Sequence, residues 1–166
     1  MLNQINKEVY QKCGLKIAGY RAETESREYD ACRYELNGLK IISRTAKITP
    51  KKAGQFVTFW KRNSNGVIEP FAQNDNFNFY VVNLRTEKRL AQFVFQKAVL
   101  IKHGIVSSDK NEGKRAFRVY PPWDMAINKQ AARTQKWQLD YFYEINELTE
   151  ITSTIHQKLL ALFEPK

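Results

Sequence analysis

Apolar residues recur at two spacings along this chain, and the spacing separates the expected strands from the expected helices. Alternating or continuous apolar positions predict strands. Such stretches occupy 30–36, 39–48, 55–62, 77–85, 90–95 and 115–120. Apolar positions three or four residues apart predict amphipathic helices. These occupy 2–13, 97–103, 125–145 and 149–163, and Asp124 is the expected N-cap of the third.

Turn residues indicate how the first three strands are joined. Asn37-Gly38 is a strong two-residue hairpin signal. The segment 49–54 contains Pro50, which has no backbone donor and therefore fits a turn better than a paired strand. The stretch 55–62 is apolar on both faces, which favours a position at the centre of a sheet. We therefore expect a three-stranded antiparallel meander of 30–36, 39–48 and 55–62.

The order of the elements predicts the fold class. Strands are followed by helices, and helices stand at both ends of the chain, which is typical of a mixed sheet covered by helices. A length of 166 residues suits one ordinary domain. We expect a single α/β (α+β) domain over 1–166, with a mixed central sheet that contains the meander.

Several classes of protein do not fit this sequence. No apolar run approaches the roughly 18 residues of a membrane helix, so we expect no membrane insertion. The N-terminal segment lacks the apolar stretch of a secretory signal, which predicts a cytoplasmic location and reduced thiols at Cys13 and Cys32. These cysteines lack metal-site spacing, and His103 and His156 are the only histidines. We therefore expect no metal site and no cofactor.

The positive charge is concentrated in two windows. The chain has 27 basic and 17 acidic residues and a net charge of +10. The window 40–62 has a net charge of +7 and no acidic residue, and the window 110–137 has a net charge of +5. Clustered positive charge favours a polyanionic partner such as nucleic acid.

Cations of the two windows are the candidate phosphate contacts, because Lys and Arg neutralise the nucleic-acid backbone and release counterions. In the helix expected from residue 125, the three cations fall on one stripe. The ordinary alternative is a solvated turn with edge-strand lysines that prevent aggregation. Arg44 lies mid-strand and needs a partner, for which we expect Glu35. The candidates are Arg44, Lys47, Lys51, Lys52, Lys61, Arg62, Arg115, Arg118, Lys129, Arg133 and Lys136.

The sequence contains no motif of an established catalytic site: a Gly-rich phosphate loop, HExxH, GxSxG and paired cysteines are all missing. A magnesium-dependent nuclease would need converging carboxylates and a nearby lysine. Glu25, Glu35, Asp75 and Lys47 are the residues open to that alternative. The strand expected at 55–62 has no carboxylate, so we assign no catalytic residue.

Three motifs resemble the MepB-like family: RTAKITPKKAGQFVTFWKR, GKRAFRVYPPWD and KQAARTQKWQ. The resemblance extends from about 25 to 142. It implies a restriction-endonuclease-like α/β core, DNA binding, and a role linked to the staphylococcal multidrug-efflux operon whose third gene gives the family its name. It also implies a degenerate PD-(D/E)xK site, in which Asp75 could represent the first aspartate while 92–97 offers no second carboxylate.

These observations lead to three hypotheses. The first is a non-catalytic protein that binds nucleic acid, in particular double-stranded DNA, through the phosphate backbone. The second is a nuclease that uses Mg²⁺ at the degenerate site. The third is an interaction protein for an acidic partner or for a small ligand held between sheet and helices.

Overall fold

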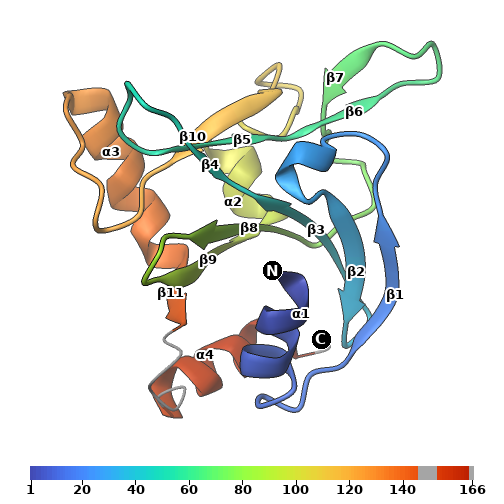
Figure 1. Cartoon of the computed structure of the whole chain (residues 1–166). Coiled ribbons are helices and arrows are strands. Elements are labelled where there is room, and N and C mark those ends of the chain that lie inside the picture. The colour runs from blue at the N-terminus through green and yellow to red at the C-terminus, as the bar shows by residue number, and fades with distance from the viewer. Residues whose placement is uncertain (146–152, 165–166) are drawn as a thin grey trace.

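The largest sheet of the protein has six strands and runs through the middle of the molecule (Figure 1). The structure, a computed structural model, describes residues 1–145 and 153–164. In sheet order the strands are β1 (Ile17–Ala22), β2 (Cys32–Leu36), β3 (Leu39–Thr45), β8 (Phe79–Arg85), β9 (Leu90–Gln96) and β11 (Phe142–Ile145). Neighbours are antiparallel except β3 and β8, which are parallel. This mixed sheet with helices around it confirms the expected α+β class.

The β2–β3 hairpin forms where the sequence predicts it. Leu36 pairs with Leu39, and the loop residues Asn37 and Gly38 have φ angles of 50° and 77°. Positive φ at both loop positions gives the connection the twist that the flanking strands require. The other edge of β3 pairs in parallel with β8, so the third strand of the expected meander is not its neighbour.

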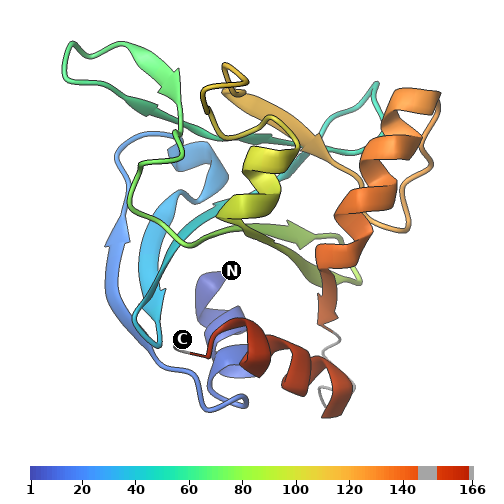
Figure 2. The same ribbon diagram turned by 180° about the vertical axis from the view of Figure 1, so that it is seen from behind.

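A smaller sheet covers one face of the main sheet (Figures 1 and 2). Its order is β10 (Ala116–Val119), β5 (Gln55–Thr58) and β4 (Lys47–Ile48). The expected strand 39–48 breaks at Ala46, whose N–H donates to the carbonyl of Asn83 at 2.9 Å, where the β3–β8 ladder ends. The chain then leaves the main sheet. The predicted meander is therefore wrong, because β4 and β5 pair in the second sheet.

The expected strand 55–62 is also divided, at Phe59. After this residue β6 (Trp60–Arg62) pairs with β7 (Ile68–Pro70) in a separate hairpin. Phe59 is fully buried, and its ring stacks on that of Tyr80 with 4.0 Å between centroids. The stretch is therefore central only in the small sheet, where β5 is the middle strand.

Both faces of the main sheet carry buried apolar side chains. On one face Ile42, Val82 and Phe93 belong to the core beneath the small sheet. On the other face Ile41 and Val81 belong to a second core that includes residues of the terminal helices. Figures 1 and 2 show α1 (Leu2–Ile5) and α4 (Ser153–Leu162) on this second side. The sheet therefore separates two cores, as expected for strands without a polar face.

Three of the expected helices are present. The N-terminal helix continues from α1 as a π-helical stretch, Asn6–Tyr10, and α2 spans Lys97–Lys102. In α4, Leu159 is buried as its amphipathic pattern predicts. The positions Ile151 and Ile155 of that pattern lie outside the side chains that the structure describes.

The helix expected over 125–145 is wrong at both ends. α3 spans only Lys129–Gln138, and its N-cap is Asn128 instead of Asp124, because the Asn128 Oδ1 accepts the N–H of Ala131 at 2.8 Å. After a 3-10 turn, residues 142–145 form β11 at the edge of the main sheet. Pairing with β9 satisfies this segment's backbone groups and overrides the helical pattern.

Two expectations about the chain as a whole can be compared with the described residues. Within 1–145 and 153–164, no helix has the length and apolar character that crossing a membrane requires. Cys13 and Cys32 are buried free thiols. Burial raises the pKa of Cys32 to about 11, so this thiol stays protonated at neutral pH.

Candidate nucleic-acid interface

The turn between β4 and β5 is held rigidly by Arg118 of β10. The Arg118 Nη1 donates to the carbonyls of Ala53 and Gly54, both at 3.3 Å, and the Nη2 donates to Thr49 Oγ1 at 2.9 Å. Gly54 has a φ of 76°, and a Cβ there would lie 2.7 Å from the ring of Tyr120. The backbone of the turn is therefore pressed against the end of β10.

Lys51 and Lys52 stand on the tip of this braced turn, and both are exposed. Arg118 has a different position, because it is half-buried and its donors contact the turn itself. The sequence placed all three cations in one group of phosphate contacts. The geometry separates two cations that face solvent from one that holds their support in place.

Helix α3 is fastened to the same strand by two glutamines. Gln138 is fully buried; its Oε1 accepts the N–H of Tyr120 at 2.8 Å, and its Nε2 donates to the carbonyl of Arg118 at 2.9 Å. Gln135 donates to the carbonyls of Pro121 at 3.0 Å and Asp124 at 2.9 Å. Because β10 anchors both elements, α3 and the 49–54 turn lie side by side (Figures 1 and 2).

The predicted stripe of cations on α3 is exposed. Lys129, Arg133 and Lys136 all face solvent, and the helix contains no acidic residue. Among the described residues, no ion pair involves these three side chains or the two lysines of the turn. We call these five the basic surface: Lys51, Lys52, Lys129, Arg133 and Lys136.

A hollow of about 280 Å³ opens beside this surface, between β10, α3 and the segment that follows α2. Its walls include His103, Lys114, Gln130 and Trp137, and no acidic residue of the described chain lines it. The imidazole of His103 stacks on the indole of Trp137 with 3.9 Å between centroids. Burial, together with the neighbouring charge of Lys102, lowers the pKa of His103. His103 and Trp137 are 34 residues apart in the chain, so the sequence did not indicate their contact.

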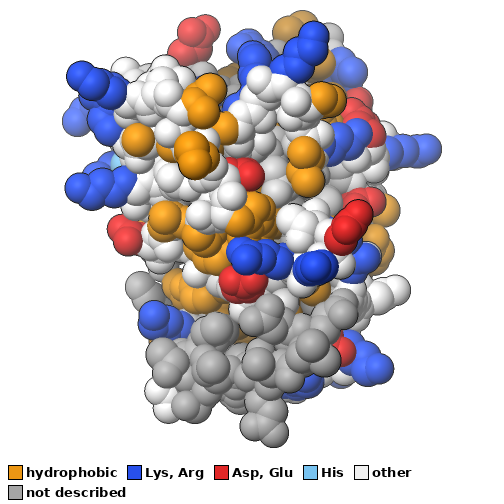
Figure 3. All heavy atoms as spheres, turned by 60° about the vertical axis from the view of Figure 1, so that its left-hand side comes forward, with side chains coloured by type: hydrophobic (Ala, Val, Ile, Leu, Met, Phe, Trp, Pro, Cys, Tyr) orange, Lys and Arg blue, Asp and Glu red, His pale blue; other side chains and the backbone are white. Residues whose placement is uncertain are grey.

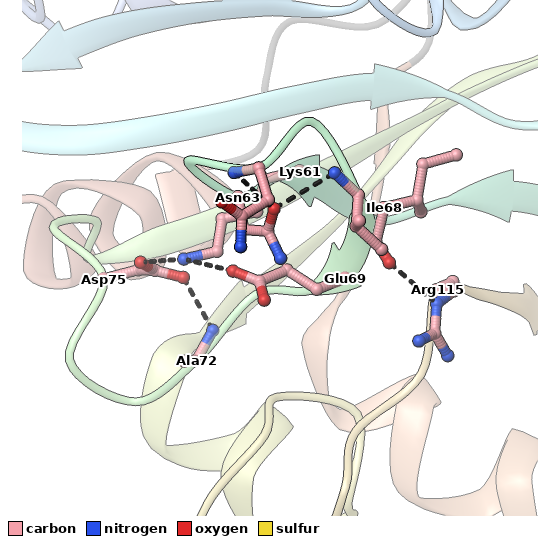
Figure 4. A network of polar contacts seen from close by, with 9 residues as sticks. Lys61, Asn63, Ile68, Glu69, Ala72, Asp75 and Arg115 are labelled. Carbon is pink, nitrogen blue, oxygen red and sulfur yellow. Dashed lines mark hydrogen bonds and ion pairs between the residues drawn. The ribbon is translucent and has the colours of Figure 1, made fainter.

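Three of the candidate cations lie on or beside the β6–β7 hairpin: Lys61, Arg62 and Arg115. Figure 4 shows Lys61 and Arg115 with their partners. The Lys61 Nζ lies 2.6 Å from the Asp75 Oδ1 and 3.4 Å from the Glu69 Oε1. The Arg115 Nε donates to the carbonyl of Ile68 at 3.4 Å. In Figure 1 this hairpin and α3 stand at opposite sides of the molecule. The candidates therefore do not form one continuous group.

Arg62 of the same hairpin is also paired. Its Nε lies 2.6 Å from the Glu25 Oε1, and its Nη1 donates to the carbonyl of Gly66 at 2.9 Å. Charge counts along the chain missed this pairing, because Glu25 lies 37 residues away in the sequence.

Arg44 is buried inside the protein and does not reach a surface. Its side chain is 1% exposed, and its Nη2 lies 2.5 Å from the Glu23 Oε2. The expected partner, Glu35, is wrong, because in the hairpin register Glu35 faces Lys40. Glu23 follows β1 and also accepts from the Arg33 Nε at 2.5 Å. The pairing of Arg44 with Glu23 joins residues 21 positions apart in the chain, so local patterns did not indicate it.

The residues of the nuclease alternative do not converge. Asp75 and Glu25 are paired with hairpin cations, and Glu35 lies on β2. Lys47 is exposed, with its Nζ 4.7 Å from the ring centroid of Tyr29. Within the described residues, no three His, Cys, Asp or Glu side chains are grouped as a metal site requires.

Comparison with known proteins identifies the family of this chain. The model of the MepB-like family matches residues 23–144. The chain belongs to the MepB-like family. A structure titled "Crystal Structure of MepB" is 34% identical to this chain, with a TM-score of 0.76, and the match covers 79% of this chain and 88% of that one. The matched range confirms the resemblance in the sequence motifs and includes the whole basic surface.

A second solved structure is more distant from this member of the MepB-like family. It is the bacterial homing endonuclease I-Ssp6803I, which is 18% identical, with a TM-score of 0.44 over 94% of this chain and 88% of that one. None of the curated proteins matches the chain.

Proposed function

We propose that this MepB-like protein binds double-stranded DNA without cleaving it, through phosphate contacts made by the basic surface. The observation that carries the proposal is that five exposed cations take part in no ion pair of the described residues and stand on two elements braced against β10. Such cations are available to neutralise phosphates, and the released counterions drive association. Phosphate contacts carry no base information, so weak sequence preference is expected.

A salt titration tests the proposal. Binding of a fluorescent 20-base-pair duplex is measured by anisotropy at several KCl concentrations. Each phosphate contact changes the slope of log affinity against log salt by about −0.9, so five contacts predict a slope of about −4.5. Absence of binding at low salt, or a flat slope, would contradict the proposal.

Matched variants locate the contacts. Replacement of Lys51 and Lys52 by alanine should make the slope shallower by about 2, because two phosphate contacts are removed. Replacement of Lys61 and Arg62 by alanine removes the same charge from the hairpin, where carboxylates already pair it, and should leave the slope within about 0.5 of wild type. Equal effects of both pairs would indicate attraction by net charge alone.

A second candidate function is the binding of a small ligand. A cavity of about 720 Å³ lies between the N-terminal helix and the strands β1 to β3, within the range of ligand sites. Its walls include Glu23, Asp30 and Arg27, so a polar ligand fits it best. Thermal-shift screening with an Ala22→Trp variant, which narrows the cavity, would test this candidate. A ligand that raises the melting temperature of wild type and of the Ala22→Trp variant equally would argue against binding in this cavity.

A further inference from the structure

The segment between β10 and α3 exposes two large apolar side chains. Met125 is 81% exposed and Ile127 is 73% exposed, more than the other large hydrophobic residues of the described chain. Figure 3 views the molecule with the left-hand side of Figure 1 turned forward and shows hydrophobic side chains gathered among Lys, Arg, Asp and Glu side chains. Keeping such side chains in water forgoes the favourable free energy of burial. Their position therefore calls for something that covers them.

The exposure is not a result of a loose loop. The N–H of Asp124 donates to the carbonyl of Pro121 at 3.0 Å, and the Gln135 Nε2 donates to the carbonyls of Pro121 and Asp124. Trp123 packs edge-on against Phe142, with 5.7 Å between centroids. Asn128 then caps α3. With both ends of the segment fixed, Met125 and Ile127 are presented on a rigid support.

Charge identifies the kind of partner that can cover this segment. On the adjoining helix α3, Lys129, Arg133 and Lys136 are exposed and no acid is present, while the segment itself contains one acid, Asp124. The stripe of α3 begins two residues after Ile127. A second copy of this chain would bring like charge against this rim, whereas a nucleic-acid duplex brings phosphates on both sides of an apolar stack of bases.

We propose that Met125 and Ile127 form a wedge that inserts between base pairs of the duplex whose phosphates the basic surface holds. Met and Ile are among the apolar residues that unstack base steps and kink a duplex from the minor groove. Pyrimidine–purine steps, such as TA, resist this deformation least. The wedge gives the complex a bent duplex and a preference for flexible steps. This inference rests on the proposed DNA binding.

Bending and unstacking test the wedge. The probe is a 20-base-pair duplex with TA steps at its centre, carrying a dye at each end for energy transfer and, in a second version, 2-aminopurine at a central step. Wild type should raise both the energy transfer and the 2-aminopurine fluorescence. Met125→Ser/Ile127→Ser should lose both signals and bind about tenfold more weakly, with the salt slope unchanged because no charge is removed.

The matched control replaces two other exposed apolar residues, Tyr20 of β1 at 57% and Val67 of the β6–β7 hairpin at 58% exposure; both elements stand on the opposite side of the molecule from α3 (Figure 1). The Tyr20→Ser/Val67→Ser variant should bend DNA as wild type does. If wild type binds DNA but gives neither signal, or if the Met125/Ile127 variant keeps both, the wedge is wrong and the proposed DNA binding stands. Phosphate contacts are favoured at low salt, so the decisive condition is about 50 mM KCl. If wild type binds no duplex there, both the wedge and the proposed DNA binding are wrong. Capture of an acidic protein instead of DNA also overturns the wedge.

Discussion

The β6–β7 hairpin and the basic surface are both rich in cations, but the partners of these cations differ. On the hairpin, Lys61 lies between two carboxylates and Arg62 is paired with Glu25. On the basic surface, the cations face solvent on braced elements. Exposed ion pairs contribute little stability, yet they cancel the field that a phosphate would sense. The partners of a cation, more than the local charge count, therefore decide which region can attract a polyanion.

The most deeply buried cation, Arg44, should give the largest effect. Replacing Arg44 by alanine empties a buried position and leaves Glu23, whose side chain is 15% exposed, with Arg33 but without Arg44, which should cost about 2–5 kcal/mol of unfolding free energy. Lys136→Ala, which removes an exposed cation of the basic surface, should change stability by less than about 0.5 kcal/mol. Urea unfolding measures both. A small loss at Arg44 would mean that Glu23 and Arg33 reorganise around the gap.

Two glycines with the same φ of 76° compare the supports of the two regions. At Gly54 a Cβ would lie 2.7 Å from Tyr120, whereas at Gly66 in the hairpin no atom of the described residues would lie within 4 Å of it. Gly66→Ala should cost only the left-handed conformation, about 1–2 kcal/mol. Gly54→Ala should cost about 1–2 kcal/mol more, because the turn must also move away from β10.

The affinity for DNA should separate these two variants as well. Gly54→Ala displaces Lys51 and Lys52 and should weaken duplex binding, while Gly66→Ala should leave it unchanged. Unfolding curves and anisotropy titrations of both variants are the measurements. Equal losses of stability would show that the contact with Tyr120 does not brace the turn.

Removing Glu25 should make the hairpin more like the basic surface, because Arg62 would lose its carboxylate partner. Glu25→Ala frees Arg62 and should make the hairpin more attractive to DNA, with a salt slope steeper by at most about 1. Stability should change by no more than about 1 kcal/mol, because the pair is exposed. Anisotropy against salt and urea unfolding check the two parts. A shallower slope would be inconsistent with screening of Arg62 by this carboxylate.

The smallest effect concerns His103 beside the basic surface. Its pKa is lowered in the folded protein by burial and by Lys102, so the unfolded chain binds the proton more readily. Its contribution to stability is therefore present above pH 6.5 and is lost as the pH falls below that value. Urea unfolding between pH 7 and pH 5 should show a weaker pH dependence for His103→Gln than for wild type. His156 is present in both proteins, so the difference isolates His103.

Local patterns predicted those parts of the fold that depend on neighbours in sequence. The Asn37-Gly38 hairpin, the strands β8, β9 and β10 and the helix α2 formed where the spacing of apolar residues and turns placed them. The meander failed because nothing in 39–48 or 55–62 records that the chain changes sheets at Ala46 and Phe59. The segment 142–145 was expected in a helix because its aromatic spacing suits either structure, and the free edge of β9 decided between them.

The sequence predicted which cations belong to the candidate site, but not which of them lie together on one surface. The exposure of Lys51 and Lys52 and the stripe on α3 follow from a turn and from helical periodicity. The pairing of Lys61 and Arg62 depends on Asp75 and Glu25, which are 14 and 37 residues away in sequence. The burial of Arg44 likewise depends on Glu23, which is 21 residues away in sequence.

The amide of Gln138 has a consequence for how the protein tolerates change. It accepts the N–H of Tyr120 and donates to the carbonyl of Arg118, and so makes the two hydrogen bonds with β10 that the backbone of a neighbouring strand would make. Hydrogen bonds to backbone atoms do not depend on which side chains the strand carries. Substitutions of the β10 side chains can thus alter the shape and polarity of this surface while α3 stays docked, whereas replacement of Gln138 would remove two of the four hydrogen bonds by which Gln135 and Gln138 hold the helix.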